Sequence, residues 1–278
     1  MRAMMLPDGH RLHLQDGPFD LVIGADGPEM EVHRAFDVAI ARFSTVRAEL
    51  NAEISLLRQP TERLPEGAVA RRMYRATAEH ARSGFITPVA AASGAVAEEV
   101  LYAMVSAAAV ERAHVNNGGS IAIHLTPWQE YRAGVVDRPD HPLLVAEALV
   151  HWTDAVRGIS TSGWQRNFSF GIADAVTVLA ATASGAEAAA MLVANAVDLP
   201  GHPAITRVPA SDLRPESSLG ARLVTQHVGD ISPGDIQQAL ANGVSVAETL
   251  LAREHLIAAA LHLGGETRIV GVLPLAAS

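Results

Sequence analysis

Between Glu111 and Asp198 the chain carries three related phrases: ERAHVNNGGSIAIHL (residues 111–125), RGISTSGWQRNFSFGIADAVTVLA (157–180) and ATASGAEAAAMLVANAVD (181–198). In the first two, a strand pattern runs into a polar turn that contains glycine, and in the third a similar turn opens a helix. Glycine has no Cβ, so the backbone N–H groups of such turns can approach an anion or a ring closely. The sequence therefore predicts a ligand site in this region.

The first candidate group is Asn116, Asn117, Gly118 and Gly119, which links two strand patterns. Asn-Gly is a strong hairpin signal, so a simple turn is one interpretation. The doubled Asn and the doubled Gly are more than a turn needs, and the amide side chains offer both donors and acceptors. Contact with a ring or a ribose is the other interpretation.

The second candidate group is Ser160, Thr161, Ser162 and Gly163, which brings three hydroxyls and a glycine together ahead of Trp164. An ordinary polar turn would explain this composition. Hydroxyls and glycine N–H groups also bind anions well, so contact with a nucleotide or flavin is the alternative that we favour.

Two acidic residues complete the candidates. Asp174 precedes the strand pattern AVTVLA and is either a surface charge at a strand edge or a pocket carboxylate. Glu187 follows Ser184 by the spacing of a capping box, and this structural role is favoured over a metal role.

The composition sets wider limits. With 278 residues the chain can bury a large core, as a single domain (1–278) or as two lobes (1–110 and 111–278). The net charge of −9 argues against a nucleic-acid partner. All 21 basic residues are Arg, so a Schiff-base lysine and a P-loop are excluded, and the lack of Cys excludes disulfides and thiolate sites. No HExxH, GxSxG or GxGxxG motif is present.

The sequence also bears on location. The N-terminus has no apolar segment long enough for a secretory signal, which predicts a cytoplasmic protein. The apolar stretches 86–110 and 173–199 are interrupted by acidic residues, so we interpret both as core segments and expect no membrane contact.

The first third of the chain predicts a hairpin over residues 10–25, a helix over 30–58 and a short helix over 68–80. Arg71, Arg72 and Arg75 lie close together on that short helix, as a solvated basic face or, alternatively, as a phosphate clamp. A strand up to Thr87-Pro88 and then an alanine-rich helix to about Val110 should follow.

The remaining elements are predicted mainly from short local sequence patterns. Residues 139–142 predict a turn, and 143–156 fit a strand or a helix equally well. Ser232-Pro233 should begin a helix that Gly243 closes, and Ser245 with Glu248 should open another. A hairpin is expected over 262–273. The Ala-Ser-Gly-Ala phrases at 92–95 and 183–186 indicate an internal strand-turn-helix duplication.

The phrases VNNGGSIAIHL, ISTSGWQ and ASGAEAAAMLVANAVD resemble the ApbE-like superfamily, which includes the FAD:protein FMN transferases. The likeness runs from Gln15 to about Leu261 and is closer to a UPF-type branch, in which FITP with Thr87, GIAD and ANAVD also recur. The resemblance implies an α+β, ApbE-like fold with antiparallel or mixed sheets and packed alanine-rich helices. It also implies a homodimer and a site that binds FAD or another flavin or nucleotide, to which Thr87 would contribute.

Departures from the transferase pattern limit what the resemblance implies. Ser120 stands where the family has Asp after the double glycine, and the Mg²⁺ ligands of the family correspond to Glu187 and Met191. A thioether is a poor ligand for a hard cation, so the Mg²⁺ pattern is degraded. Of the family's His-Ile-x-Asp-Pro phrase, the chain keeps the aspartate as Asp174.

Three functions follow as hypotheses. The protein is an enzyme acting on a flavin, nucleotide or related heterocycle, with Asp174 as acid or base and with Asn117 and Thr161 orienting the ligand. Alternatively, it is a ligand-binding or accessory protein that has lost the FMN-transfer residues. The third hypothesis is a structural homodimer whose turns bind nothing.

Overall fold

The computed structural model describes residues 1–82, 84–136 and 144–273, and the chain divides into two compact units. Unit 1 contains Met1–Tyr131, Val150–Ser160 and Ala180–Ala188, and unit 2 contains Arg132–Leu149, Thr161–Leu179 and Ala189–Ser278. The described residues form seven α-helices and thirteen strands. The predicted α+β class is confirmed, and the division into one domain or two lobes stays a prediction.

The sheet of unit 1 is antiparallel throughout. Its strands are, in spatial order, β1 (Arg2–Met5), β2 (Arg11–Asp16), β3 (Phe19–Asp26), β4 (Arg112–Asn117), β5 (Ser120–Leu125) and the first residues of β8 (Gly158–Ser162). The hairpin expected over 10–25 is confirmed as β2 and β3. Buried residues alternate along β2, β4 and most of β3, as they do in a sheet with one covered face.

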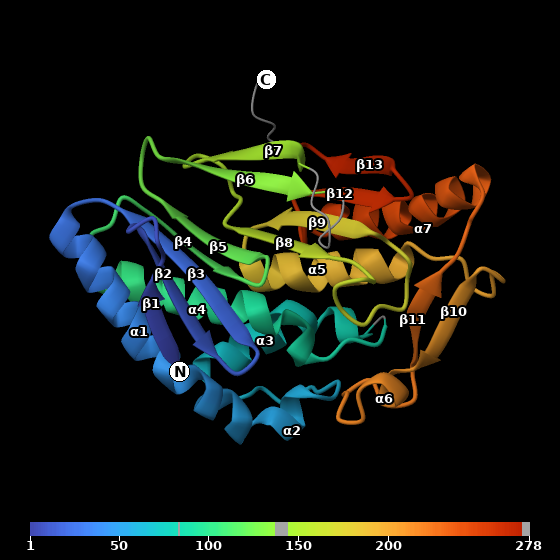
Figure 1. Cartoon of the computed structure of the whole chain (residues 1–278), viewed down its shortest axis with the longest axis horizontal. Coiled ribbons are helices and arrows are strands. Elements are labelled where there is room, and N and C mark those ends of the chain that lie inside the picture. The colour runs from blue at the N-terminus through green and yellow to red at the C-terminus, as the bar shows by residue number, and fades with distance from the viewer. Residues whose placement is uncertain (83, 137–143, 274–278) are drawn as a thin grey trace. The chain divides into compact units, whose positions relative to one another are not determined.

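The helices α1 (Glu29–Ala52) and α4 (Ala92–Ala107) pack on one face of the sheet (Figure 1). Unit 1 also contains α2 (Ile54–Leu57), α3 (Ala68–Thr77), which packs against α4, and the short 3₁₀ turns η1 (His80–Arg82) and η2 (Pro88–Ala91). The helix expected over 30–58 is present, with a break at Glu53. The core includes Leu14, Leu21, Ile23, Phe43, Val100 and Met104, all buried. Alanines on α4 allow its close packing.

The strand expected before Thr87-Pro88 is wrong. Residues 84–87 form no strand, and Pro88 instead begins η2, which leads into α4. Proline is suited to the first position of a helix because its φ is already fixed near the helical value and its missing N–H is not needed there.

The helical stretch Pro88–Ala107 has the length and composition of a membrane-spanning helix, with a mean hydropathy of 1.3. It is the one stretch of this kind among the described residues, and 56% of its most apolar window is buried. α4 packs against α1, α3, β4 and β5, so the structure supports the interpretation of this segment as a core helix.

Most strands of unit 2 form three groups. β9 (Ala175–Ala180) pairs antiparallel with β12 (Ala258–Leu263), which pairs antiparallel with β13 (Glu266–Gly271). β10 (Ile205–Pro209) pairs antiparallel with β11 (Leu223–Val228), and β6 (Glu130–Val136) forms a two-stranded sheet with β7 (Leu144–His151). For the segment 143–156, which fitted a strand or a helix, the structure shows a strand over Leu144–His151. The turn expected at 139–142 lies outside the described residues.

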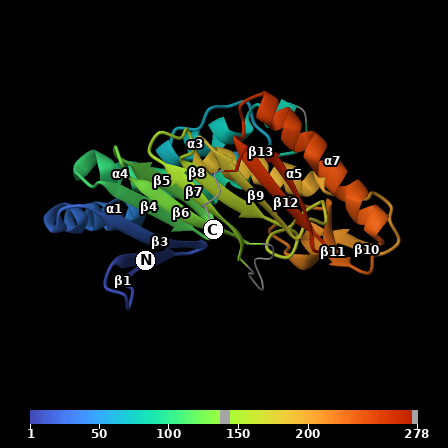
Figure 2. The same cartoon turned by 90° about the horizontal axis from the view of Figure 1, so that it is seen from above.

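The helices of unit 2 include α6 (Ala210–Leu213), α7 (Pro233–Ala252) and most of α5 (Ala183–Ala196). α7 lies along β12 and β13 (Figure 2). The expected hairpin near the C-terminus is confirmed as β12 and β13. The boundary between the units passes through β6, β7, β8, β9 and α5.

The two C-terminal helices expected around Gly243 are wrong, because α7 is continuous from Pro233 to Ala252. The predicted start is confirmed: Ser232 is the N-cap, and its side chain forms a capping box with Asp235. Gly243 is buried in mid-helix, where a β-carbon would lie 2.3 Å from Val197 Cγ2. This glycine therefore permits close packing and does not end the helix.

Candidate functional site

The first candidate group forms a two-residue hairpin turn between β4 and β5. Gly118 and Gly119 adopt positive φ angles of 57° and 93°, which favour glycine at both central positions. The side-chain carbonyl of Asn116 accepts a hydrogen bond from the Gly119 N–H at 2.8 Å. The geometry of a simple turn therefore accounts for the two glycines and for Asn116.

Asn117 has a different role, because its side chain leaves the hairpin. The residue is 2% exposed. Its Oδ1 accepts from the Asp20 N–H at 3.2 Å, and its Nδ2 donates to the Ser93 carbonyl at 3.0 Å. Asn117 thus ties the hairpin to the first turn of α4.

The first turn of α4 is also where Glu187 binds. The Gly94 N–H donates to Glu187 Oε2 at 2.7 Å, and Gly94 follows Ser93 directly. Two predicted site residues from different phrases, Asn117 and Glu187, therefore meet at neighbouring residues of one helix. Thr87 lies five residues before α4 and is 5% exposed, and its carbonyl accepts from the Ala90 N–H.

A second carboxylate lies at the start of α5. Both the N–H and the hydroxyl of Ser184 donate to Glu98 Oε1, at 2.6 and 2.7 Å. The hydroxyl of Thr182 accepts from the Gly185 N–H at 3.1 Å, so Thr182 is the residue that caps α5. The capping box expected for Ser184 and Glu187 is therefore wrong in register.

Glycine allows the backbones of unit 1 to meet closely here. A β-carbon on Gly94 would lie 2.4 Å from the Ala183 carbonyl oxygen, and one on Gly158 would lie 2.1 Å from the Thr182 carbonyl carbon. Real β-carbons do not approach backbone so closely. The first turn of α5 is therefore in direct contact with α4 on one side and with β8 on the other.

Ser160 lies in β8 and not in a turn, and β8 pairs with β5. Ser160 Oγ and Ser120 Oγ are 2.9 Å apart, and both residues are buried. The expected polar turn at Ser160–Ser162 is therefore wrong, since these residues belong to the strand. Ser120 occupies the position at which the resemblance implied an aspartate, and its hydroxyl is used within the sheet.

Thr161 and Gly163 belong to unit 2. Thr161 Oγ1 lies 2.8 Å from Thr177 Oγ1. A β-carbon on Gly163 would lie 2.3 Å from the Asp174 carbonyl oxygen, so only glycine fits against the backbone of Asp174. Ser162, between them, is 7% exposed.

Asp174 is held at the turn that joins β12 and β13. Its Oδ2 accepts from the Gly264 N–H at 2.8 Å, and its own N–H donates to the His262 carbonyl at 3.0 Å. His262 is 4% exposed, and its Nδ1 lies 2.8 Å from Thr267 Oγ1. Asp174 thus contacts the backbone of His262 and Gly264, while the side chain of His262 bonds Thr267.

Sequence reasoning missed His262, Gly264 and Thr267, because the C-terminal hairpin looked purely structural. One signal was available. The double glycine of HLGGET resembles that of VNNGGS, and both pairs have positive φ in the structure. Paired glycines at a hairpin leave N–H groups accessible to a carboxylate, as Gly264 does for Asp174.

Two of the three arginines of α3, Arg71 and Arg72, bond other groups of the protein, and the phosphate clamp stays a prediction. Arg71 Nε donates to the Pro65 carbonyl at 2.9 Å. Arg72 donates to Glu99 Oε2 at 2.9 Å and to Glu98 Oε2 at 3.3 Å, and its guanidinium lies 5.6 Å from the centre of the Tyr102 ring. Arg72 is therefore held by carboxylates of α4.

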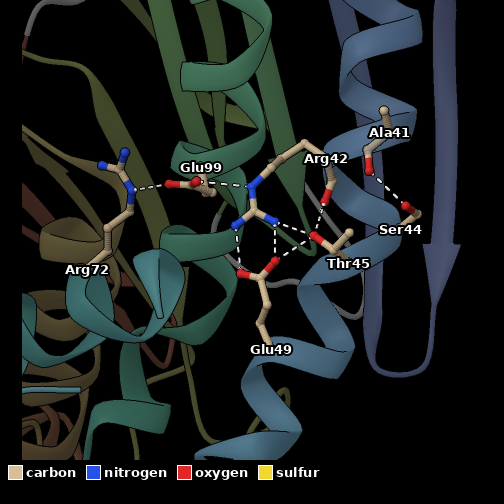
Figure 3. Close-up of polar contacts among 7 residues, drawn as sticks. All are labelled: Ala41, Arg42, Ser44, Thr45, Glu49, Arg72 and Glu99. Carbon is tan, nitrogen blue, oxygen red and sulfur yellow. Dashed lines mark hydrogen bonds and ion pairs between the residues drawn. The ribbon is translucent and has the colours of Figure 1, made fainter. Parts of the chain in front are cut away.

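The same network reaches α1 (Figure 3). Arg42 donates to Glu99 Oε1 at 3.1 Å and binds both oxygens of Glu49, at 2.7 and 2.8 Å. Hydrogen bonding to Glu49 raises the pKa of Arg42, and hydrogen bonding to Arg42 lowers the pKa of Glu49. Glu99 lies between the two arginines and is 7% exposed, so the pairs connect three helices.

The donor set does not fit a Mg²⁺ site built mainly from protein oxygens. Among residues 1–82, 84–136 and 144–273, no group of three or more His, Asp or Glu side chains could hold a metal ion. Glu187 Oε2 already binds the Gly94 N–H, and the second position that the resemblance assigns to Mg²⁺ is the thioether of Met191. We therefore derive no chemical step through Mg²⁺.

Three solved structures are similar to this chain. They are the apo flavinyl transferase ApbE of Pseudomonas stutzeri (12% identity, 90% of each chain covered, TM-score 0.47), the ApbE protein of Thermotoga maritima (12% identity, 93% of this chain and 96% of that chain, TM-score 0.44) and the flavin transferase ApbE of Vibrio cholerae (12% identity, 94% and 96%, TM-score 0.44). Comparison with curated proteins gave no match.

A family model described as AbpE bacteria matches residues 3–269, which is nearly the whole chain. The match includes both candidate groups, Asp174 and Glu187. The chain therefore belongs to the AbpE bacteria family, and its expected place in the ApbE-like superfamily is confirmed.

Proposed function

We propose that the protein binds a flavin, nucleotide or related heterocycle and that Asp174 acts as acid or base in a transfer reaction on this ligand. The family membership supports the ligand class, because the similar solved proteins carry the name of flavin transferases. The observation that carries the proposal is the placement of Asp174, whose Oδ2 is fixed by the Gly264 N–H at 2.8 Å.

A carboxylate that is oriented by a backbone donor can accept a proton in a defined direction. In a transfer from FAD, an acceptor oxygen would form a bond to the phosphorus of the FMN half while the bond from that phosphorus to AMP breaks. Asp174 would take the proton from the attacking hydroxyl. The products would be the flavinylated acceptor and AMP.

The first experiment is a titration with FAD, with and without Mg²⁺, followed by flavin fluorescence and by an assay for AMP. Asp174→Asn should abolish AMP release and leave FAD binding unchanged. Asp212→Asn, an exposed aspartate of α6, is the matched control and should retain both. AMP release by Asp174→Asn at the rate of the unsubstituted protein would remove Asp174 from the proposed role.

A second candidate function is that of a ligand-binding or accessory protein without transfer chemistry. Two observations favour it: Met191 stands at one of the two positions that the resemblance assigns to Mg²⁺, and Ser120 bonds Ser160 where the resemblance implied an acidic side chain. FAD binding without AMP release would support this function. If FAD does not bind at all, pterins and other nucleotides are the next ligands to test.

The homodimer implied by the resemblance is part of the proposal. Light scattering after gel filtration, at several protein concentrations, would measure the mass against the 29.2 kDa of one chain. FAD that fails to raise the melting temperature would favour a structural homodimer with no ligand, because a ligand that binds only the native state stabilises it.

A further inference from the structure

Helices α4 and α5 each contribute a carboxylate that binds the first turn of the other helix. Glu98 of α4 accepts from the N–H and hydroxyl of Ser184 in α5, and Glu187 of α5 accepts from the N–H of Gly94 in α4. All four residues lie in unit 1. Each helix therefore provides the anion at the N-terminus of the other helix.

The exchange is reciprocal, but the two glutamates are not equivalent in sequence. The repeated phrases align Ala92 with Ala183, and from these residues Glu98 lies further along its helix than Glu187 does. A duplication alone would not produce this pair of contacts. The arrangement depends on how the two helices meet.

The physical benefit lies in the unpaired N–H groups of a helix start. The first N–H groups of a helix have no partner within the helix, and the helix dipole favours negative charge there. At 2.6 to 2.7 Å, these contacts are charge-assisted hydrogen bonds, which are shorter and stronger than neutral ones. Each carboxylate thus satisfies donors that the helix cannot satisfy itself.

The backbones of the two first turns touch, and this couples the hydrogen bond to Glu187 with the hydrogen bond to Glu98. Gly94 has no side chain, and a β-carbon on it would lie 2.6 Å from the Ser184 nitrogen and 2.4 Å from the Ala183 oxygen. The donor to Glu187 and the donor to Glu98 are therefore on touching backbone segments. A shift of one first turn displaces the other.

Arg72 fixes the remaining oxygen of Glu98. Arg72 donates to Glu98 Oε2 at 3.3 Å and to Glu99 Oε2 at 2.9 Å. Glu99 also accepts from Arg42. Glu98 thus has one oxygen on Ser184 and the other on Arg72. Its position is set by α3 as well as by α4.

We propose that Glu98 and Glu187 form a crossed pair of helix caps that locks the first turns of α4 and α5 together, and that Glu187 is a structural anion and not a ligand of Mg²⁺. The proposal does not depend on the flavin or nucleotide function. It assigns Glu187 a partner, Gly94, at the position where the resemblance implied a metal ligand.

Amide hydrogen exchange of Gly94 and Ser184, measured by NMR, tests the coupling. Glu98→Gln and Glu187→Gln should each accelerate the exchange of both amides, by about tenfold if about 1.4 kcal/mol of local stability is lost. Asp154→Asn is the matched control, because its carboxylate also accepts one backbone N–H at 2.7 Å, from His151 in a turn. The control should leave both amides unchanged.

Acceleration of only the directly bonded amide in each variant would show two independent caps and would overturn the proposal. Unchanged exchange in both variants would overturn it as well. Ser184→Ala provides a milder variant if Glu98→Gln fails to fold, because it removes only the hydroxyl donor. It should accelerate both amides by a smaller factor.

The metal part of the proposal is tested by thermal unfolding in millimolar MgCl₂, without flavin. The melting temperature of the unsubstituted protein and that of Glu187→Gln should not depend on Mg²⁺. Stabilisation by Mg²⁺ that disappears in Glu187→Gln would identify Glu187 as a ligand and overturn the proposal. A failure of FAD to bind bears on the proposed function alone, since neither readout here uses FAD.

Discussion

Gly158 lies so close to Ala183 that a β-carbon on Gly158 would be 2.2 Å from the Ala183 nitrogen. The strand β8 and the first turn of α5 therefore approach each other more closely than any other residue type at position 158 would allow.

Gly158→Ala should lower the free energy of unfolding by about 3 kcal/mol, because rigid backbone and not a flexible side chain opposes the added methyl. Urea denaturation followed by circular dichroism would measure the loss. Gly84→Ala is the matched control, since a β-carbon there meets no described atom within 4 Å. Equal midpoints for the two variants would contradict the predicted close contact.

Glu99→Gln should destabilise the protein more than Glu49→Gln. Glu99 lies between Arg42 and Arg72 with a side chain 10% exposed, whereas the side chain of Glu49 is 34% exposed and accepts from Arg42 at the outer end of the network. Loss of one carboxylate between two partly buried cations should cost about 2–3 kcal/mol, against about 0.5–1 kcal/mol for the outer pair. Urea midpoints decide the order, and a larger loss for Glu49→Gln would reverse our assignment of the central carboxylate.

His114 should make the protein less stable as the pH falls. Burial, with a smaller contribution from Arg112, lowers the pKa of His114 to about 4 from its ordinary 6.5. The unfolded chain therefore binds a proton that the folded chain does not, and stability present above about pH 6.5 is lost as the pH falls to about 4, by an amount on the order of 2–3 kcal/mol.

His114→Gln should reduce this loss, because the substituted side chain does not titrate. Urea unfolding of both proteins at pH 7, 5.5 and 4.5 would measure it. A parallel decline of the two proteins with pH would show that His114 does not contribute to the acid sensitivity.

The start of α7 provides a paired test of capping. Ser232 accepts from the Asp235 N–H and forms a capping box, whereas Ser245, which also has a capping pattern in the sequence, lies exposed in mid-helix. Ser232→Ala should cost about 1 kcal/mol, and Ser245→Ala should be neutral or slightly stabilising because alanine favours helix interiors. Thermal unfolding of the two variants checks this, and equal losses would mean that Ser245 caps a separate helix after all.

The parts of the fold that the sequence predicted well have local causes. Hairpins at residues 10–25 and 262–273 follow from turn residues between alternating patterns, and the structure confirms both. Gly243 was misinterpreted for the opposite reason. Its environment is set by residues distant in sequence, such as Val197, and no local pattern reports such neighbours.

The same difference between local patterns and distant contacts applies to the candidate site. The resemblance drew attention to Asn117, Asp174 and Glu187, but the partners of these residues could not be read from spacing. Gly94 and Glu187 are 93 residues apart, and Asp174 and Gly264 are 90 apart. Contacts over such separations depend on how helices and hairpins pack, so the sequence located the residues and the structure supplied their bonds.

Gly243 restricts the sequences that could replace α7 in a redesigned protein. A β-carbon there would lie 2.3 Å from Val197 and 2.9 Å from Leu261, both fully buried. The surface of α7 therefore has a gap at Gly243, against which the side chains of Val197 and Leu261 pack. A transplanted helix with the same apolar face and the same caps but with alanine at this position would force Val197 or Leu261 to shift, so a generic amphipathic helix does not reproduce the packing of α7.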